Sequence, residues 1–107
     1  MSVSVVDNTS SVESALRAAL AKGLDSAGAR AEAYAKETVH VITGNLRDSI
    51  GHEASDDAVV VYAGMDYAPY EELGTSRQDA HPYLRPSVMD HTGELMDIIG
   101  NAVSSVL

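Results

Sequence analysis

Apolar and small residues recur at intervals of three and four along the first third of the chain. This spacing places them on one face of a helix, which we expect to run from about Ser11 to about Val39. Ser10 and Glu13 form a capping box, a motif that marks the first turn of a helix. The recurring positions are Val12, Ala15, Leu16, Ala19, Leu20, Gly23, Leu24, Ala27, Ala31, Tyr34, Ala35 and Thr38.

Two glycines interrupt the predicted helix. Gly23 and Gly28 lower its helix propensity and mark either a bend or a close helix crossing. Residues 1–10 are polar and precede the apolar stripe, so we expect them to form a flexible N-terminal arm. Residues 11–107 are too few for two cores and are expected to form a single domain.

The middle of the chain has the pattern of a β-hairpin. The helical spacing ends at residues 43–45, and a short turn follows. Residues 50–55 alternate loosely between apolar and polar, and residues 58–63 form a run rich in valine. Asp56 and Asp57 separate the two runs and predict a turn, so the pair is expected to form a small antiparallel sheet.

Two further helices are predicted in the last third. Ala68–Leu73 is expected to form a short helix that Asp66 caps, and residues 75–81 are expected to form a loop. Pro82 and Pro86 then precede a C-terminal helix, because a proline fits the first turn of a helix but not its interior. The apolar stripe of this helix comprises Val88, Met89, Thr92, Leu95, Met96, Ile99, Ala102, Val103 and Val106.

These elements predict an α+β fold. A long N-terminal helix, a small antiparallel sheet, a short helix and a C-terminal helix would pack with the helices on one face of the sheet. The 107 residues include no Phe and no Trp, so the core must be built from Val, Ile, Leu, Met, Ala and Tyr. Such a core buries little large apolar surface, and burial against another subunit would add stability.

The charge of the chain argues against one class of function. Sixteen Asp and Glu against seven Lys and Arg give a formal charge of −9, which argues against a protein that grips nucleic acid through phosphate contacts. The acidic surface, with lysine only at Lys22 and Lys36, fits a halophilic host, because salt screens the repulsion between carboxylates. It also fits an acidic face that repels passing DNA.

Catalytic, metal and membrane sites have no support in the sequence. His52 and Glu53 are the centre of the densest titratable group, but alternating residues of a strand point to opposite faces and cannot share a metal ion. The chain has no cysteine, no G-x-S-x-G motif and no P-loop. The start of the chain is polar and no apolar run approaches about 20 residues, so we expect a soluble protein without an export signal. We expect no enzyme activity and no cofactor.

Four tyrosines lie in the middle and last thirds. Tyr62, Tyr67, Tyr70 and Tyr83 could stack on bases of single-stranded nucleic acid, but the segments between them are not positively charged. We expect the rings to fill the small core and a subunit interface instead.

Three segments resemble the signatures of a tail-component family of tailed phages, encoded in the head–tail joining region. Residues 43–50, TGNLRDSI, resemble its T-G-x-L-x-x-S-I signature. Residues 67–75, YAPYEELGT, resemble its Y-A-x-Y-x-E-F-G-T segment, and residues 81–87, HPYLRPS, resemble P-F-L-R-P-A. The shared positions with a structural role are Thr43, Gly44, Leu46, Ser49, Ile50, Tyr67, Tyr70, Glu72, Gly74, Thr75, Pro82, Tyr83, Leu84, Arg85 and Pro86. Leu73, Tyr83 and Ser87 differ from the usual residues. Glu72 and Arg85 are expected to pair, either within one subunit or between subunits.

The resemblance implies a structural virion protein in the neck of a tailed virus. Such proteins form six- or twelve-fold rings between the head connector and the tail tube, with DNA passing through the channel without sequence-specific binding. Their partners would be further copies of the chain, head connector or adaptor proteins, and tail terminator or tail tube proteins. The ring would assemble in the host cytoplasm, with no membrane partner and no cofactor.

Two exposed loops are the candidates for contacts with neighbouring subunits or rings. They comprise Ser55, Asp56, Asp57 and Ala58 at the predicted hairpin tip, and Ser76, Arg77, Gln78 and Asp79 after the short helix. Two alternatives remain open. The chain could be a tail-terminator or head-closure ring protein, or, from another class, an acidic regulatory protein that mimics DNA.

Overall fold

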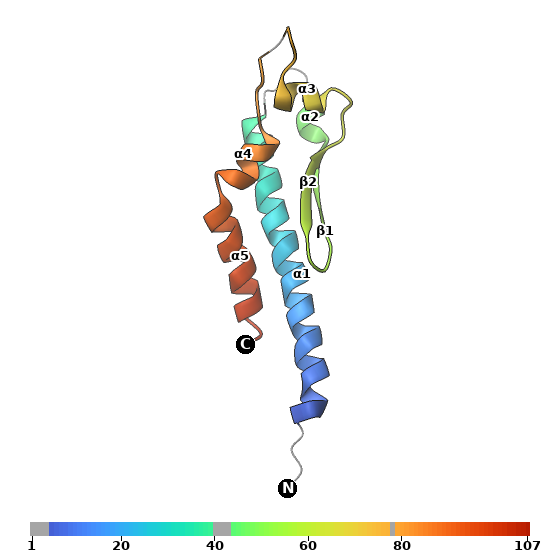
Figure 1. Ribbon diagram of the computed structural model, residues 1–107, viewed down its shortest axis with the longest axis vertical. Coiled ribbons are helices and arrows are strands. Elements are labelled where there is room, and N and C mark those ends of the chain that lie inside the picture. Colours follow the sequence, from blue (N-terminus) through green and yellow to red (C-terminus); the bar gives the residue numbers. More distant parts are fainter. Residues whose placement is uncertain (1–4, 40–43, 78) are drawn as a thin grey trace.

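The computed structural model describes residues 5–39, 44–77 and 79–107. It confirms the α+β fold class, with a long N-terminal helix, a two-stranded antiparallel sheet, short helices and a C-terminal helix (Figure 1). In chain order the elements are α1 (Val5–Thr38), α2 (Asn45–Asp48), β1 (Ile50–Ala54), β2 (Val59–Ala63), α3 (Ala68–Leu73), α4 (Leu84–Met89) and α5 (Thr92–Ser104).

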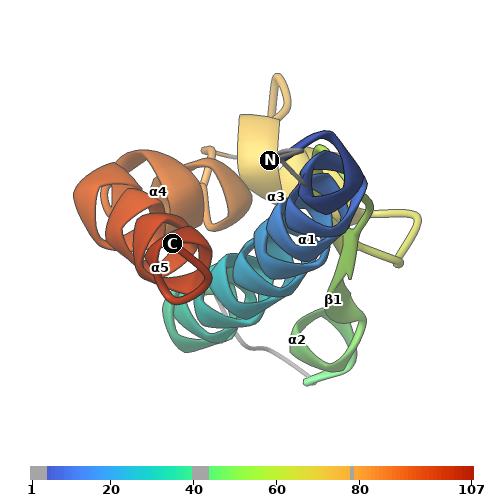
Figure 2. The same cartoon turned by 90° about the horizontal axis from the view of Figure 1, so that it is seen from below.

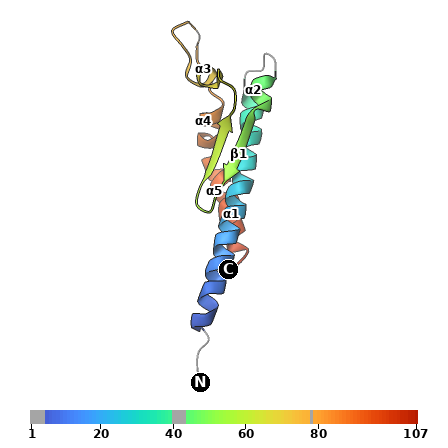
Figure 3. The same ribbon diagram turned by 90° about the vertical axis from the view of Figure 1, so that its right-hand side faces the viewer.

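Helix α1 is the central element of an elongated molecule of 74 × 23 × 22 Å. Its length is about 51 Å at 1.5 Å per residue. The hairpin packs along one side of α1 and α4 and α5 pack along another, as the view from below shows (Figure 2). The N-terminal part of α1 extends past the hairpin and past the end of α5 (Figure 3).

The hairpin presents one face to α1 and the other to solvent. Ile50 pairs with Ala63 and His52 with Val61, and these inner positions face the helix. The outer face carries Val60 and Tyr62, which are both exposed. The aromatic ring of Tyr62 lies across β1, where the absence of a side chain at position 51 leaves room for it.

Two buried clusters hold the elements together. The larger lies where α1, β1, α3 and the start of α4 meet, and the smaller lies between α1 and α5, with Val61 packed against both. Their buried members are Ala35, Val39, Leu46, Ile50, Ala68 and Tyr83 in the first, and Ala27, Ala31 and Leu95 in the second.

The helix α1 begins earlier than the capping box predicts. Residues 5–10 are helical, so this part of the expected N-terminal arm belongs to α1, and residues 1–4 lie outside the described residues. Ser10 and Glu13 therefore lie within the helix and do not mark its start. A capping motif predicts a helix start, but it does not end a helix whose earlier residues are also helical.

The C-terminal helix is two helices and not one. The chain leaves helical geometry at His91, between α4 and α5. The hydroxyl of Thr92 donates to the carbonyls of Val88 and Met89, at 3.1 and 3.2 Å, and so satisfies oxygens at the end of α4. This side-chain bond competes with continuation of the helix, which the apolar spacing alone could not reveal.

The hairpin and α3 form where the sequence predicts them. The turn at Asp56 and Asp57 joins β1 to β2, and α3 has the predicted bounds. Asp66, however, is not its cap: Tyr67 occupies the N-cap position, and no side chain bonds to the first turn.

Gly23 and Gly28 mark close crossings of α1. A Cβ atom at Gly23 would lie 2.9 Å from Cβ of Ala102 and 3.1 Å from Cα of Ile99 on α5. A Cβ atom at Gly28 would lie 2.5 Å from Cγ2 of Val59 on β2. The missing side chains allow α5 and the hairpin to approach α1, so of the two expectations the close crossing is confirmed.

We expect Gly23→Ala to lower the free energy of unfolding by about 1–3 kcal/mol, because the new methyl group clashes with the backbone of α5. Gly100→Ala is the matched control. It also lies in a helix but has no atom within 4 Å of the added Cβ, so it should stabilise by about 0.5–1 kcal/mol. Urea unfolding measures both, and equal effects would contradict the close crossing.

Candidate functional site

The three family-like segments meet at one end of the molecule. Residues 44–50 form α2 and the start of β1, residues 67–75 form α3 and its flanks, and residues 81–87 lead into α4 (Figure 1). Thr43 lies outside the described residues. The buried side chains that join the segments are Leu46, Ile50, Ala68 and Tyr83. Because these residues are distant in sequence, their shared cluster shows that the three segments build one structural unit.

Tyr83 is the centre of this unit and is fully buried. Its hydroxyl donates to the carbonyl of Ala68 over 3.4 Å, a long hydrogen bond. Burial, with the negative charge of Glu72, raises the pKa of Tyr83 to about 12. The ring therefore acts as an uncharged core residue, in agreement with the expected core role for this tyrosine.

Glu72 connects the second segment to the third. One carboxylate oxygen accepts from the backbone N–H groups of Tyr83 and Leu84, at 3.0 and 2.8 Å, and the other accepts from that of Arg85 at 3.2 Å. A carboxylate suits this place because the first amides of α4 have no partner within the helix. The contact to Arg85 is through its backbone N–H, whereas the sequence led us to expect an ion pair.

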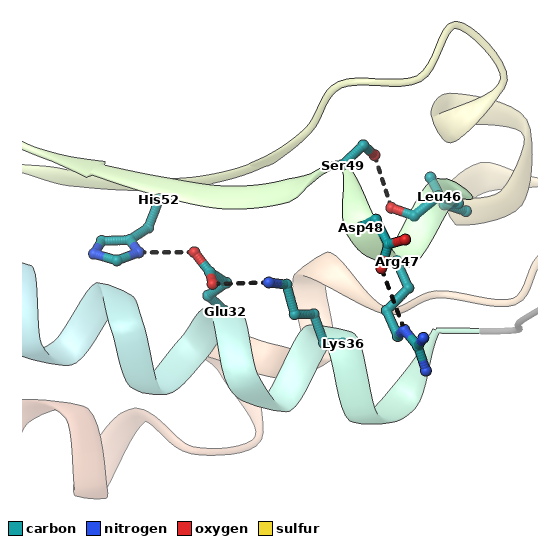
Figure 4. A network of polar contacts seen from close by, with 7 residues as sticks. All are labelled: Glu32, Lys36, Leu46, Arg47, Asp48, Ser49 and His52. Atoms are coloured by element: carbon teal, nitrogen blue, oxygen red, sulfur yellow. Dashed lines mark hydrogen bonds and ion pairs between the residues drawn. The ribbon is translucent and has the colours of Figure 1, made fainter. Parts of the chain in front are cut away.

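Glycine conformations and short polar bonds complete the segments. Gly44 and Gly74 have φ values of 84° and 77°, which explains glycine at both positions. The hydroxyl of Ser49 donates to the carbonyl of Leu46 at 2.7 Å and accepts from the N–H of Gly64 at 3.2 Å (Figure 4). These bonds tie α2 to the end of β2.

The other tyrosines of the segments are on the surface. Tyr67, Tyr70 and Leu73 are 40%, 56% and 77% exposed, and Tyr62 on β2 is 41% exposed. An open depression of about 620 Å³ lies between β2 and α3, where Met65 and Leu73 contribute to its lining. The expected core role thus holds for one tyrosine of the four, and the remaining three are exposed.

The two candidate contact loops lie far apart. The hairpin tip lies beside α1, between its two ends. The loop after α3 lies at the end of the molecule that is remote from the N-terminus (Figures 1 and 3). The described members of both loops are exposed, and Gln78 lies outside the described residues. At the hairpin tip the hydroxyl of Ser55 donates to Asp57 at 3.2 Å. In the loop after α3 the hydroxyl of Thr75 accepts from the N–H of Arg77 at 3.2 Å. Because of this separation, the two loops would contact different neighbours or different parts of one neighbour.

His52 has a structural role that the sequence analysis did not find. Its two ring nitrogens lie 2.9 Å from Glu32 Oε1 and 2.9 Å from Asp25 Oδ1, so it links the hairpin to α1. Lys36 lies 3.1 Å from the other oxygen of Glu32 (Figure 4). Glu53 is exposed on the opposite side of the strand, as expected. Asp25 and Glu32 are seven residues apart on one helix face, and this spacing was the available signal.

His52 and Glu32 shift each other's pKa values. The hydrogen bond to Glu32 raises the pKa of His52, and Asp25 adds to the effect. The same bond, with help from Lys36, lowers the pKa of Glu32. The charged forms of both residues therefore favour contact between β1 and α1.

A second polar group joins α1 to the junction of α4 and α5. Arg30 Nε lies 2.7 Å from Glu94 Oε1, and the hydroxyl of Tyr34 donates to the other oxygen of Glu94. The ring of His91 stacks on Tyr34 with centroids 3.5 Å apart. This stacking accompanies the break between α4 and α5.

Among the residues that the structure describes, no group of three or more His, Asp or Glu side chains could hold a metal ion. No helix in the described ranges is long and apolar enough to cross a membrane.

A sequence model of one protein family matches residues 4–74, about two-thirds of the chain. The family is HK97-gp10-like and is described as "Bacteriophage HK97-gp10, putative tail-component". No curated protein and no solved structure matches the chain.

We expect Glu72→Ala to lower the free energy of unfolding by about 1–3 kcal/mol, because three backbone amides lose their charged acceptor. Glu72→Gln keeps one carbonyl oxygen and should have a smaller effect. Glu37→Ala, at an exposed position of α1, is the control and should change stability by less than about 0.5 kcal/mol. Urea unfolding measures all three, and a Glu72→Ala protein as stable as the control would refute the cap.

We expect the stability that His52 contributes to be greatest between about pH 4.5 and 6.5, the ordinary pKa values of Glu and His. The raised pKa of His52 means that its contribution is lost as pH rises through the folded-state pKa. The lowered pKa of Glu32 means that its own contribution is lost as pH falls through the folded-state pKa. The midpoint temperature of thermal unfolding should therefore fall more steeply between pH 5.5 and 8.5 for the wild type than for His52→Gln. Parallel curves for the two proteins would contradict the link.

Proposed function

This chain belongs to the HK97-gp10-like family of bacteriophage tail components, and on that premise we propose that it forms a ring in the neck of the virion, joining the head connector to the tail tube. Membership makes it a structural protein of the viral tail that works with other phage head and tail proteins. The ring and its place in the neck are our proposal.

The observation that carries the proposal is the agreement between the family match and the buried cluster. The family model spans residues 4–74, which hold the first signature segment and most of the second. Both meet the third segment around Tyr83, which lies beyond the matched range. The residues they share have roles in folding, such as the core position of Leu46 and the cap formed by Glu72. A site whose residues set the shape of the chain suits an assembly protein, and we propose no enzyme activity.

The surface offers contacts in two directions along the molecule. The exposed Tyr67, Tyr70 and Leu73 lie on α3, near one extremity, whereas the hairpin tip lies part of the way down α1 (Figure 1). Exposed aromatic residues are enriched at protein interfaces because they bury large area at low entropic cost. We propose that the α3 end contacts an adjacent ring and that the hairpin tip contacts the neighbouring subunit, in a ring of six or twelve copies.

The net charge of −9 suits a channel through which DNA passes without binding, because carboxylates repel phosphates. It equally suits a halophilic host. A tail-terminator or head-closure ring would have the same chemistry and would differ only in its level within the neck.

Immunogold electron microscopy of virus particles, with antibody raised against this protein, tests the assignment. We expect gold at the junction of capsid and tail, and antibody that has been absorbed with the purified protein should give none. Gold along the tail would keep the tail-component role and contradict the neck position. Gold absent from intact particles, with the protein free in infected cells, would overturn the structural role and favour the acidic regulatory protein.

A further inference from the structure

The first turns of α1 have less cover from the rest of the molecule than its later turns. We call Ser10–Lys22 the N-terminal limb; its first turns extend beyond the hairpin and beyond the end of α5 (Figures 1 and 3). Val12 is 51% exposed, and Leu16 on the same face is partly exposed. A single helical segment is marginal in water, and most helices are stabilised by packing an apolar face. The end of α5 covers part of the limb: Ala19 is buried, and Ala15 lines a shallow depression with Ala102 and Val106. Val12, nearer the N-terminus, remains half exposed, and burial against a second copy would add stability.

An apolar groove lies between the hairpin and α5, with α1 as its floor. Its volume is about 180 Å³, room for one or two aliphatic side chains and too little for a whole helix. Met96 and Val88 at its rim are 61% and 38% exposed. The residues that line the groove are Ala27, Gly28, Ala31, Val59, Val61, Val88, Thr92, Leu95, Met96 and Ile99.

The limb and the groove are complementary in shape. The apolar face of α1 carries large side chains in the limb, at Val12 and Leu16, and small ones in the groove, at Ala27 and Ala31. Val12 and Leu16 are four residues apart, so they project from one face as adjacent knobs. Large side chains of one helix that enter a space above small residues of another give close packing.

The limb and the groove are also complementary in charge. The limb contains Arg17 and Lys22 against Glu13, whereas the rest of the chain carries the other fifteen carboxylates with five cations. The exposed Asp56 and Asp57 lie at the hairpin tip, next to the wall residue Val59. The part of the chain outside the limb is acidic, so two copies repel each other when these parts meet. The repulsion is smaller when a second copy approaches with its limb.

We propose that the N-terminal limb of one copy docks on the apolar groove of the next, with Val12 and Leu16 entering between β2 and α5. The inference rests on the proposed ring, which supplies the second copy, and it names the contact that links consecutive subunits. Because the limb and the groove are different surfaces, the contact is head-to-tail and can close into a ring.

The absence of native cysteine makes cross-linking a direct test. The single-cysteine variants Val12→Cys and Met96→Cys are mixed and oxidised in about 1 M salt, where the Debye length is about 3 Å and repulsion between copies is screened. We expect a disulfide between the two variants, identified by mass spectrometry of the joined peptides. The matched control mixes Val12→Cys with Leu73→Cys, which is 77% exposed and lies on α3, away from the groove. The groove pair should exceed this control pair several-fold.

Other occupants of the groove are outcomes of the same experiment. A Leu107→Cys variant, at the exposed C-terminus, is mixed with Met96→Cys, and a dominant disulfide there would overturn the proposal in favour of the C-terminal residues. A Val12–Met96 yield no higher than the Val12–Leu73 yield would also overturn it. If gold labels the neck but the groove pair fails, the ring stands and the limb contact is wrong. If the groove pair forms but gold is absent from particles, the contact stands and the neck role is wrong.

Discussion

The fold depends on how closely the hairpin and α5 approach one helix, α1. The small residues Gly23, Ala27, Gly28 and Ala31 let α5 approach the backbone of α1 on one side and the hairpin approach it on another. α5 lies against Gly23 at distances that a methyl group would not permit, and β2 lies against Gly28 in the same way. With no Phe or Trp in the chain, the core combines one large buried ring, that of Tyr83, with these close approaches to the backbone of α1.

Polar links decide how the packed elements are oriented around α1. His52 binds two carboxylates of α1 and aligns the hairpin, while Arg30, Tyr34 and Glu94 align the start of α5. Apolar packing is not directional, so a small core rich in alanine leaves neighbouring arrangements close in free energy. Paired, hydrogen-bonded groups at the edges of the core distinguish one arrangement from the others.

The distribution of buried and exposed residues connects this fold with a role in assembly. The signature segments place their glycines, Tyr83 and Glu72 where the chain must turn or where a helix must begin. The same segments leave Tyr70 and Leu73 exposed on α3. Apolar surface at one end, and a limb with little cover at the other, are features that a subunit can bury only against other proteins.

Much of the secondary structure followed from the sequence, because its signals come from neighbouring residues. The apolar spacing predicted α1, the aspartates at 56 and 57 predicted the hairpin turn, and the bounds of α3 agree with the structure at both ends. The three signature segments indicated the family before any fold was known, since a motif is a property of local order. The sequence also predicted that His52 and Glu53 would lie on opposite faces of a strand.

What the tertiary structure decided depends on residues that are distant along the chain. The break at His91 accompanies its stacking on Tyr34, and the partners of His52 lie 20 and 27 residues before it. Glu72 binds the amides of residues 83–85 and not the side chain of Arg85, because α3 directs its carboxylate at the first turn of α4. Burial selected Tyr83 from four similar tyrosines for the same reason: only the packed chain determines which ring is enclosed by the other elements.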